Sequence, residues 1–561
     1  MFAFLSFLWF IRESKLILFY IYLWQLKEYR PRRFLDHFRT EKGKKLIINQ
    51  INLIKIGLFL IFLVILIFQK EISRTGREGF FKFFLGVLIV FYVIEFIFAL
   101  KNIFQKKLKA PVLTGKAVIL VFGGAAMEII VLFILLGSIT DIFYFAFWLL
   151  LFDILTPVIS SLIILLTQPI TILIKNQIIK KAKIKRRGYK NLTVIGITGS
   201  CGKTSTKEFL AAILSERFKV LKTKEHQNNE MGVSQCILKE LRPDHQIFIC
   251  EMGAYKQGEI KLLSDITKPK IGILTGINEQ HLALFGSQDN IIQTTFELIE
   301  SLPEDGVAIF NGDNKYINSN AKSQIAKLHL KTQRFCSTKE KMDVWAEDIV
   351  VGEEKITFRV LAKDGDFANF EVNLLGSHNV INLLLVVSCA KELGMKLEEI
   401  AQIARNIKIE QGAIKLVKGR EGLNILDSSY SANPDGVIAD LDYLKIYQGK
   451  KLIVMPCLIE LGSASKEVHY RIGRKIGEVC APVKEPNGSH GTPSGLAIIT
   501  TKERFEEIKK GAIEAGMKKE NILFIESPDE IVAKINIFCS PGDTVLFEGR
   551  VPKELIKELR G

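Results

Sequence analysis

Cysteine is absent from the chain before position 201. The eight cysteines lie at Cys201 and beyond, and no two of them form a C-x-x-C pair. This distribution excludes a disulfide framework and a zinc site built from paired cysteines. Scattered thiols of this kind are typical of a reduced, cytosolic domain, which we expect for the later part of the chain.

Acidic residues are scarce in the first third of the chain. Residues 1–190 hold 28 Lys and Arg against 10 Asp and Glu, whereas the remaining residues hold 48 against 50. The formal net charge of +16 therefore belongs to the first third, where the basic residues lie between apolar runs. This pattern favours a membrane surface over a nucleic-acid partner. With 561 residues, 48% of them apolar, the chain is too long for one domain and too apolar to be disordered.

Four apolar runs approach the roughly 20 residues that are needed to cross a bilayer. They are Ile51–Gln69, Phe80–Leu100, Ala117–Gly137 and Asp141–Leu165. The intervals 27–50, 101–116 and 175–190 are rich in Lys and Arg, whereas the intervals after the first and third runs are poor. With four spans the rich intervals fall on one side, which the positive-inside rule makes cytoplasmic. We therefore expect a multi-pass protein of the inner (cytoplasmic) membrane, with everything after about residue 175 on the cytoplasmic side.

The first 26 residues are apolar, but they lack a small-residue cleavage site, so no removable signal peptide is expected. Arg12, Glu13 and Lys15 interrupt them, and a span would place these charges near mid-bilayer at a high cost. The sequence therefore favours an interfacial segment over a fifth span. We expect residues 169–190 to lie along the membrane surface and to end in a basic linker.

Three acids interrupt the apolar runs: Glu95, Glu128 and Asp153. Acids inside membrane spans are functional candidates, unless each lies near an interface or hydrogen-bonds a neighbouring helix. We expect the structural explanation for Glu95, which is five residues from the end of its run. For Glu128 and Asp153 both explanations stay open.

An α/β pattern begins at Leu192. The strand Thr193–Thr198 leads into the glycine-rich turn Gly199–Thr204 and then into a helical pattern. Such a turn offers backbone N–H groups to phosphates, a lysine to the β/γ oxygens and a hydroxyl to Mg²⁺. The spacing departs from the strict pattern because the first glycine is Gly196. The predicted ATP-binding residues here are Thr198, Gly199, Ser200, Cys201, Gly202, Lys203, Thr204 and Ser205.

Further motifs follow the turn in a fixed order. They are Asn228-Asn-Glu-Met-Gly232, Glu251-Met-Gly with Gly258-Glu-Ile, His281-Leu with Phe285-Gly-Ser, Asn311-Gly-Asp313, Gly376-Ser-His-Asn379 with Asn382, Asp427-Ser-Ser-Tyr-Ser-Ala-Asn-Pro434, and Glu460-Leu-Gly with His469. Together with the turn, this set resembles the Mur ligase family, the ATP-dependent peptide ligases of cell-wall synthesis. The likeness is strongest to the branch that adds D-alanyl-D-alanine, and it covers nearly all of residues 191–561.

The apolar runs and the basic intervals give an α-helical membrane region (1–175) and a basic linker (176–190). The resemblance implies an α/β central ATP-binding domain (191–409) and a Rossmann-like C-terminal domain (410–561). It implies ATP and Mg²⁺, with a substrate carboxylate attacking the γ-phosphate and an amine displacing phosphate from the acyl phosphate. The residues it implies are Lys203, Glu251 and His281 for catalysis; Thr204, Glu251 and His281 for metal; Asn379, Asn382, Asp427, Tyr430 and Asn433 for ATP; and Asn228 and Asn229 for substrate.

This chain departs from the family pattern in several places. Thr295 stands where the family usually has a carbamylated lysine that helps to bind a second Mg²⁺. Gly412 is followed by Ala413 rather than by arginine, and Glu548-Gly-Arg550 replaces a terminal Lys-Gly-Ser string. The insert 484–495 resembles a disordered loop. The linker also leaves no room for the family's uridine-binding domain.

Two functions follow from these observations. The first is a membrane-anchored ligase of peptidoglycan precursor synthesis, which adds an amino acid or a dipeptide such as D-alanyl-D-alanine to a muramyl peptide. The muramyl peptide is either lipid-linked or UDP-linked, and the absent uridine-binding domain favours the lipid-linked form. The alternative is a degenerate, nucleotide-binding membrane scaffold or regulator.

Overall fold

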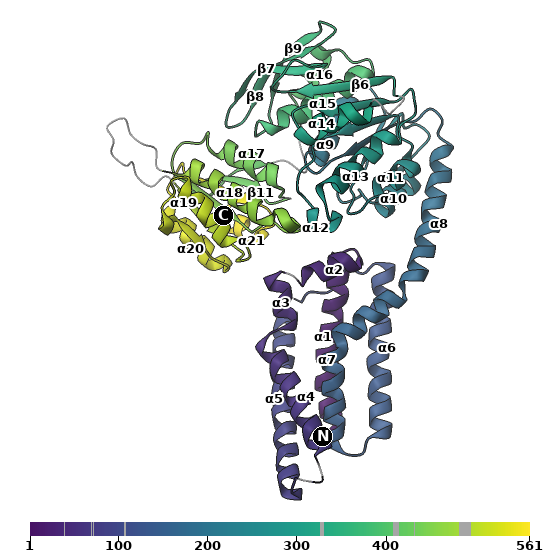
Figure 1. Cartoon of the computed structure of the whole chain (residues 1–561), viewed down its shortest axis with the longest axis vertical. Helices are drawn as coiled ribbons and strands as arrows, with labels where there is room; N and C mark the ends of the chain where they lie inside the picture. The colour runs from purple at the N-terminus through teal and green to yellow at the C-terminus, as the bar shows by residue number, and fades with distance from the viewer. Residues whose placement is uncertain are drawn as a thin grey trace. The chain divides into compact units, whose positions relative to one another are not determined.

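The protein is described from a computed structural model, which covers residues 1–561 except Arg39, Gln69, Glu71, 106–107, 326–329, 408–413, Ser431, 482–494 and Gly561. The chain forms two compact units, Met1–Ile174 and Lys175–Gly561 (Figure 1). The expected departure at Gly412 and Ala413 lies outside the described residues, and so does the predicted loop 484–495 apart from Gly495.

The first unit is a bundle of helices. The described part of the chain contains four helical stretches that are long and apolar enough to cross a membrane, and these coincide with the four predicted runs. Large apolar side chains point outward from them; Phe122 and Phe133 are 72% and 80% exposed. The helices of this unit are α1 (Phe2–Leu26), α2 (Pro31–His37), α3 (Glu41–Ile47), α4 (Gln50–Ile67), α5 (Arg74–Phe104), α6 (Gly115–Ser138) and α7 (Ile142–Leu166).

Helix α1 packs lengthwise against α5, α6 and α7, so it is a member of the bundle and not the interfacial segment that its charges suggest. The indole of Trp9 donates a hydrogen bond to the Leu149 carbonyl at 3.0 Å, and the indole of Trp24 donates to the Ser161 hydroxyl at 3.0 Å. The partners advance together along both chains, so α1 runs in the same direction as α7.

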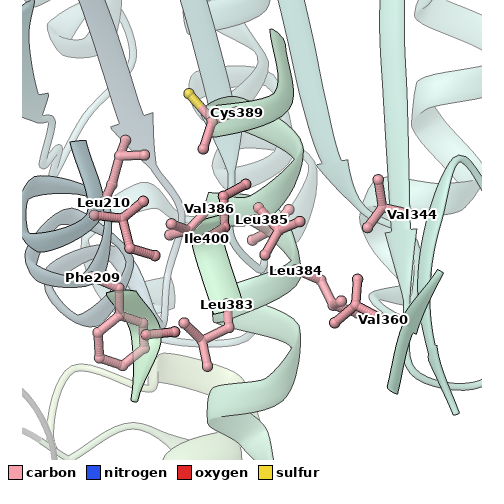
Figure 2. Packing of buried hydrophobic residues seen from close by; sticks show 14 of the residues in the cluster. Phe209, Leu210, Val344, Val360, Leu383, Leu384, Leu385, Val386, Cys389 and Ile400 are labelled. Atoms are coloured by element: carbon pink, nitrogen blue, oxygen red, sulfur yellow. The ribbon is translucent and has the colours of Figure 1, made fainter. Parts of the chain in front are cut away.

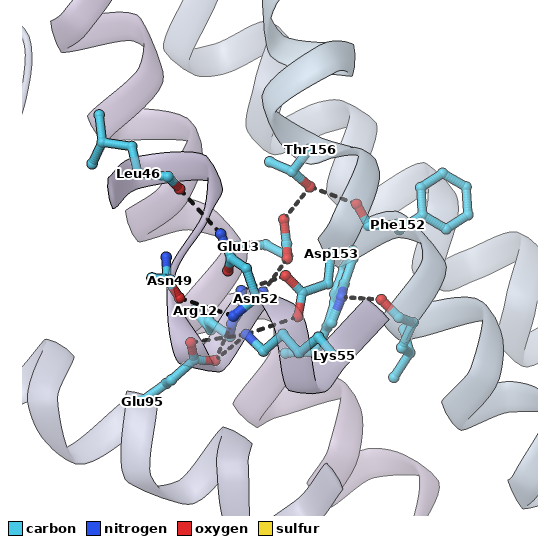
Figure 3. A network of polar contacts seen from close by, with 12 residues as sticks. Arg12, Glu13, Leu46, Asn49, Asn52, Lys55, Glu95, Phe152, Asp153 and Thr156 are labelled. Atoms are coloured by element: carbon cyan, nitrogen blue, oxygen red, sulfur yellow. Dashed lines mark hydrogen bonds and ion pairs between the residues drawn. The ribbon is translucent and has the colours of Figure 1, made fainter. Parts of the chain in front are cut away.

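The charges of α1 find partners inside the bundle (Figure 3). Arg12 pairs with Glu13, Glu95 and Asp153, and Lys55 of α4 lies 2.8 Å from Glu95 and 3.2 Å from Asp153. These contacts join α1, α4, α5 and α7. They remove much of the cost that argued against burying the charges of α1, because a buried charge is tolerated when it is paired.

The three intramembrane acids therefore have structural partners. Glu95 and Asp153 share the two basic side chains, and Glu128 accepts a hydrogen bond from Ser14 of α1 at 2.8 Å. The structural explanation expected for Glu95 agrees with these contacts, and the contacts of Glu128 and Asp153 favour the same explanation, which the sequence left open.

Helix α8 (Gln168–Arg187) corrects the second membrane-surface expectation. Its C-terminal half belongs to the α/β unit, because Ile179 and Ala182 enter a hydrophobic core there. The Arg186 guanidinium donates hydrogen bonds to the carbonyls of Thr267, at 2.8 Å, and Leu192, at 3.2 Å. These contacts hold the basic C-terminal end of α8 against the α/β unit.

The α/β unit begins with a nine-stranded sheet in the order β2-β3-β1-β4-β5-β6-β7-β8-β9. Strands β1 to β7 are parallel, and β7, β8 and β9 form an antiparallel extension. The strands are β1 (Thr193–Thr198), β2 (Val220–Lys222), β3 (Ile247–Glu251), β4 (Ile271–Leu274), β5 (Val307–Asn311), β6 (Thr332–Ser337), β7 (Val344–Val351), β8 (Ile356–Ala362) and β9 (Phe367–Val372). The helices are α9 (Lys203–Ser215), α10 (Glu230–Glu240), α11 (Glu259–Thr267), α12 (Leu282–Phe285), α13 (Gln288–Glu300), α14 (Lys315–Ile325), α15 (His378–Glu392) and α16 (Leu397–Ala404).

Helix α15 lies at the centre of one core of this sheet (Figure 2). Its apolar run Leu383–Val387 is fully buried between α9 and the strands, where it meets Phe209 and Val360. The parallel strands β1, β3 and β4 end at the same edge, so Thr198, Glu251 and Leu274 mark the carboxyl edge of the sheet. Ligands of open α/β sheets bind at this edge.

A six-stranded sheet follows, in the order β10-β11-β15-β12-β13-β14, and it is parallel apart from β10. Helices α17 and α18 cover a core that includes Val437, Leu441 and Ile472. The strands are β10 (Lys415–Lys418), β11 (Asn424–Ser428), β12 (Lys451–Met455), β13 (Gly495–Ile499), β14 (Ile522–Phe524) and β15 (Thr544–Glu548). The helices are η1 (Arg420–Gly422), α17 (Pro434–Leu444), η2 (Gly462–Ala464), α18 (Ser465–Cys480), α19 (Phe505–Glu514), η3 (Lys519–Asn521), α20 (Pro528–Phe538) and α21 (Lys553–Arg560).

Candidate active site

The turn between β1 and α9 requires glycine at two positions. Gly199 has φ +146° and Gly202 has φ +78°. A Cβ atom on Gly199 would lie 2.4 Å from the Thr275 hydroxyl, and one on Gly202 would lie 2.5 Å from the Asn382 side-chain oxygen. The loop is thus pressed against the end of β4 and against α15, with the start of α9 behind it. Helix N-termini with such loops are ready-made phosphate sites.

Lys203 lies along this loop. Its ammonium group donates to the Gly199 carbonyl at 2.6 Å and to the Ser200 carbonyl at 3.4 Å. Burial lowers the pKa of Lys203, and Glu251 opposes that shift. Burial raises the pKa of the neighbouring Cys201 to about 12, so this residue remains a thiol and contributes no nucleophile. Thr198, the last residue of β1, fixes the start of the loop, because its hydroxyl donates to the Met252 carbonyl at 2.9 Å.

Glu251, at the end of β3, is the centre of the polar cluster beside the loop. Its carboxylate accepts hydrogen bonds from the Thr204 hydroxyl and from the Asn228 amide, both at 3.1 Å, and lies 3.2 Å from the Lys207 ammonium. Burial raises the pKa of Glu251, but Lys207, Lys203 and Asn228 outweigh that effect and hold it below the ordinary value. The carboxylate is therefore ionised at neutral pH.

Thr204 and Glu251 fit a magnesium site. Mg²⁺ prefers hard oxygen ligands and is usually bound through one or two carboxylates together with substrate phosphates and water. The described residues contain no cluster of three or more His, Cys, Asp or Glu that could hold a metal by itself. Here Mg²⁺ would bind the Thr204 hydroxyl and the Glu251 carboxylate beside the phosphate loop.

The two asparagines after β2 have different tasks. Asn228 contacts Glu251 through its side chain, and its carbonyl accepts a hydrogen bond from the Gly253 amide at 2.8 Å. Asn229 caps α10 by accepting hydrogen bonds from the amides of Met231 and Gly232. Asn228 thus faces the site, whereas Asn229 fixes the helix that follows.

The loop after β4 joins the phosphate loop to the C-terminal domain. The backbone N–H of Asn278 donates to the Ser200 hydroxyl at 3.2 Å. The Asn278 side chain donates to Asn433 and Asp435 of the C-terminal domain, both at 3.0 Å. Three residues further on, the His281 imidazole lies 2.6 Å from the Glu460 carboxylate. The two domains thus meet beside the phosphate loop.

A cavity of about 300 Å³ lies between the same two domains. It is lined from the central domain by Thr338, Ile349, Ser377, His378 and Ile381, and from the C-terminal domain by Asp435, Ile438, Ala439 and Asp442. His378 Nδ1 is buried and has no hydrogen-bond partner among the described residues. Burial lowers the pKa of His378, so the ring is neutral and can hydrogen-bond a polar molecule in the cavity.

Asn379 and Asn382 support the loop from α15. Asn379 is fully buried and donates to the Leu375 carbonyl at 2.8 Å, and its side-chain oxygen accepts from Asn382 at 3.2 Å. Asn382 in turn faces Gly202. Both side chains therefore hold the loop in this structure, and contact with adenine stays a prediction.

Comparison with known proteins agrees with this geometry. Residues 197–390 match the family model of the Mur ligase middle domain, and residues 414–551 match that of the "Mur ligase, glutamate ligase domain". The UDP-N-acetylmuramoyl-tripeptide–D-alanyl-D-alanine ligase of Synechocystis sp. is 31% identical over 381 residues, which are 65% of this chain and 75% of that protein. The chain belongs to the Mur ligase family. The enzymes of this family are ATP-dependent, amide-forming ligases.

Other relatives and solved structures extend the likeness. The same ligase from Bacillus subtilis is 28% identical over 388 residues, 68% of this chain and 78% of that protein. The crystal structure of MurF from Acinetobacter baumannii has a TM-score of 0.59 at 26% identity and covers 69% of this chain and 80% of its own. MurF from Thermotoga maritima, solved in complex with ADP, has a TM-score of 0.58 at 24% identity, which shows the shared fold.

A second metal site of the Mur ligase kind does not fit the described residues. Thr295, which the resemblance places at the family's modified lysine, is 6% exposed, and its hydroxyl donates to the Ile291 carbonyl at 2.8 Å. His281 is engaged by Glu460. No described cluster supplies further metal ligands.

The other two predicted ATP residues lie in the C-terminal domain. The Asp427 carboxylate accepts hydrogen bonds from the Ser429 amide, at 3.1 Å, and hydroxyl, at 2.6 Å. The Tyr430 ring stacks against His226 of the central domain, with ring centres 6.3 Å apart. Burial and the nearby carboxylates raise the pKa of Tyr430 to about 12, so its hydroxyl stays protonated. Direct contact of either residue with ATP stays a prediction.

Several residues of the site were not predicted. Lys207 is 1% exposed and pairs with Glu251, and it lies one helical turn after Lys203 on α9. Asn278, Asp435 and Glu460 make contacts between the domains. Lys207 had a local signal, a second lysine at helical spacing, whereas the interdomain pairs are separated by more than 150 positions and have none.

Proposed function

We propose that this chain is a membrane-anchored ligase that joins an amino acid or a dipeptide such as D-alanyl-D-alanine to a muramyl peptide with ATP. The observation that carries the proposal is the Glu251 carboxylate, held by Thr204, Asn228 and Lys207 beside the phosphate loop. Both quoted relatives are named as ligases that add D-alanyl-D-alanine to a UDP-linked muramoyl tripeptide. The named substrates of those relatives are the basis for the substrate class proposed here.

The chemistry is the activation of a carboxylate by phosphoryl transfer. A substrate carboxylate attacks the γ-phosphorus of ATP, ADP leaves, and the resulting acyl phosphate then reacts with the amine, which displaces phosphate and forms the amide. Phosphoryl transfer depends on positioning and on stabilising charge, because the protein makes little covalent chemistry in that step. Lys203 presents the positive charge, and the backbone N–H groups at the start of α9 face the phosphates.

Magnesium would be held by Thr204 and Glu251 together with the phosphates of ATP. When bound, it neutralises charge on the transferring phosphoryl group. Asn228 and Lys207 keep the Glu251 carboxylate ionised and oriented. The adenine ring is expected in the cavity between the domains, where Ser377, His378 and Asp435 offer polar groups.

We further propose that the bundle spans the membrane five times, because α1 packs against α5, α6 and α7 and its Arg12 and Glu13 are paired. The basic intervals then share the cytoplasmic side, and the N-terminus lies on the opposite side. Reporter tags test this: a tag before α1 should be accessible from outside the inner membrane, and one after Gly561 should not. If both tags are labelled from the cytoplasm, α1 does not cross the membrane.

A lipid-linked muramyl peptide is the proposed carboxylate donor. Helix α8 ends at Arg187 and β1 begins at Thr193, so no uridine-binding domain is inserted between them. Exposed basic side chains lie in the intervals expected on the cytoplasmic side, and near a membrane surface each attracts anionic head groups by about 1 kcal/mol. They include Arg32, Lys44, Lys45 and Lys109. A polyprenyl-pyrophosphate head group has the matching charge.

The experiment uses the full chain in nanodiscs with ATP, Mg²⁺ and D-alanyl-D-alanine. Lipid-linked and UDP-linked muramyl tripeptides are supplied in separate reactions, and the products are identified by mass spectrometry. We expect ADP release that depends on the added dipeptide, with the lipid-linked donor used faster. Nucleotide binding without amine-dependent ADP release from either donor would instead support the scaffold function, which the missing lysine at Thr295 favours.

A further inference from the structure

The segment from Asn278 to Ala283, here called the strap, follows β4 and includes the start of α12, and the C-terminal domain contacts it at several points. We propose that Glu460 is a positioning residue that latches the strap and thereby holds the two domains closed over the phosphate loop. The inference deepens the proposed function, because it assigns the contact that closes the site. Glu460 stands outside the expected catalytic and ATP-binding residues.

Glu460 grips the strap twice. Its carboxylate lies 2.6 Å from His281 Nδ1, and its backbone carbonyl accepts a hydrogen bond from the Ala283 amide at 3.0 Å. The Glu460 side chain is 6% exposed and that of His281 is 26% exposed. Such a shielded contact between charged or polar groups is stronger than one at the rim.

Both partners have an unusual backbone. His281 has φ +62° and Glu460 has φ +65°, in the left-handed region that side chains other than glycine rarely adopt. Strain of this kind persists where the surroundings impose it, and it is often found at functional contacts. Gly462 lets the two segments approach closely, since a Cβ atom there would lie 3.1 Å from Ala283. The backbone is thus shaped to bring Glu460 onto the strap.

The strap also touches the phosphate loop. The Asn278 backbone amide donates to the Ser200 hydroxyl, and the Asn278 side chain donates to Asn433 and Asp435. One short segment therefore contacts the phosphate loop at one end and the C-terminal domain along its length. The strap thus connects the phosphate loop to the C-terminal domain, with Glu460 fixing its far end.

A second interdomain pair provides a matched control. Arg471 of α18 lies 3.5 Å from Glu279 of the strap, with side chains 39% and 16% exposed. This pair also joins the strap to the C-terminal domain, but it is longer and more open to water. Exposed pairs of this kind contribute little. Removing the Arg471 charge should therefore leave closure nearly intact.

The test is hydrogen exchange, followed by mass spectrometry, on the full chain in nanodiscs, with and without a non-hydrolysable ATP analogue and Mg²⁺. The readout is the peptide that contains residues 278–286. Glu460→Gly removes the side chain without adding backbone strain, and Glu460→Gln keeps a hydrogen-bond acceptor. We expect exchange in this peptide to be at least tenfold faster in Glu460→Gly, partly restored in Glu460→Gln, and changed less than threefold in Arg471→Gln.

Kinetics give the second readout. In Glu460→Gly we expect kcat for amide formation to fall at least tenfold while KM for ATP changes less than threefold, because the phosphate loop is intact. Unchanged exchange in Glu460→Gly, or equal effects of Glu460→Gly and Arg471→Gln, would overturn the proposal. The exchange experiment requires no turnover, so failure of the proposed ligase activity and failure of the latch are separate results.

Discussion

Each unit of the chain buries a lysine almost completely: Lys55 in the helical bundle and Lys207 in the α/β unit, with side chains 2% and 1% exposed. Lys55 shares Glu95 and Asp153 with Arg12, and the partners come from four helices. Lys207 instead supports Glu251, which also contacts Thr204 at the phosphate loop. The first arrangement joins helices, whereas the second prepares a carboxylate for a ligand.

Structural and functional charges differ in the partners that they bond. In the bundle the basic groups bond acidic side chains of the bundle itself. At the phosphate loop the ammonium of Lys203 bonds only backbone carbonyls among the contacts found, and a phosphate oxygen is a stronger partner than a neutral carbonyl. Removing charge from the loop should therefore affect rate, and removing charge from the bundle should affect stability.

The largest effect is expected from Lys203→Ala. Loss of a group that stabilises developing charge costs about 10²–10³ in rate or more, so amide formation should fall by at least that factor. The unfolding temperature should change little, because the bonds of Lys203 are local. The measurement is amine-dependent ADP release from the full chain, with Lys219→Ala, an exposed site in the same unit, as the control. Retained turnover in Lys203→Ala would show that Lys203 does not stabilise the transferring phosphoryl group.

Arg12→Leu is the corresponding change in the bundle. It leaves Glu13, Glu95 and Asp153 with Lys55 as their remaining basic partner, and breaking a buried ion pair typically costs about 3–5 kcal/mol. The measurement is unfolding of the full chain in detergent, followed by circular dichroism. The control is Arg74→Leu, whose side chain is 88% exposed. If both variants unfold alike, the network does not hold the bundle together.

Two truncations test whether the C-terminal half of α8 is part of the α/β unit. A chain that starts at Lys175 keeps Ile179, Ala182 and Arg186, whereas one that starts at Lys190 loses their packing and hydrogen bonds. We expect the shorter chain to be less stable by at least about 3 kcal/mol. The measurement is denaturant unfolding of the two soluble proteins. Equal stability would mean that α8 only tethers the unit.

The protein that starts at Lys175 also tests which carboxylate donor the enzyme uses. If the bundle and its basic intervals hold a lipid-linked substrate, the protein that starts at Lys175 should use the lipid-linked peptide at least tenfold more slowly than the full chain does. Its rate with the UDP-linked peptide should change little. If it uses the UDP-linked peptide as fast as the full chain uses either donor, the lipid-linked proposal fails.

Features with a local signature were predictable from the sequence. The four apolar runs, the strand Thr193–Thr198 and the glycine turn each show in consecutive residues, and all are confirmed. The place of α1 in the bundle was not predictable in this way, because Arg12 is costly in lipid unless Lys55, Glu95 and Asp153 are known to lie beside it. The contact between Glu460 and His281 was not predictable for the same reason: each residue belongs to a recognised motif, but the two are 179 positions apart.

The smallest expected effect concerns bicarbonate, which supplies the carbamate of the modified lysine in the family. Thr295 replaces that lysine, lies buried on α13 and uses its hydroxyl within its own helix. Activity in carbon-dioxide-free buffer should therefore equal activity with added bicarbonate, within twofold. Thr295→Ser, which keeps the hydroxyl, should behave in the same way. A larger stimulation by bicarbonate would show that another lysine is carbamylated. That lysine would then supply a ligand for a second metal ion, which the residues around His281 lack.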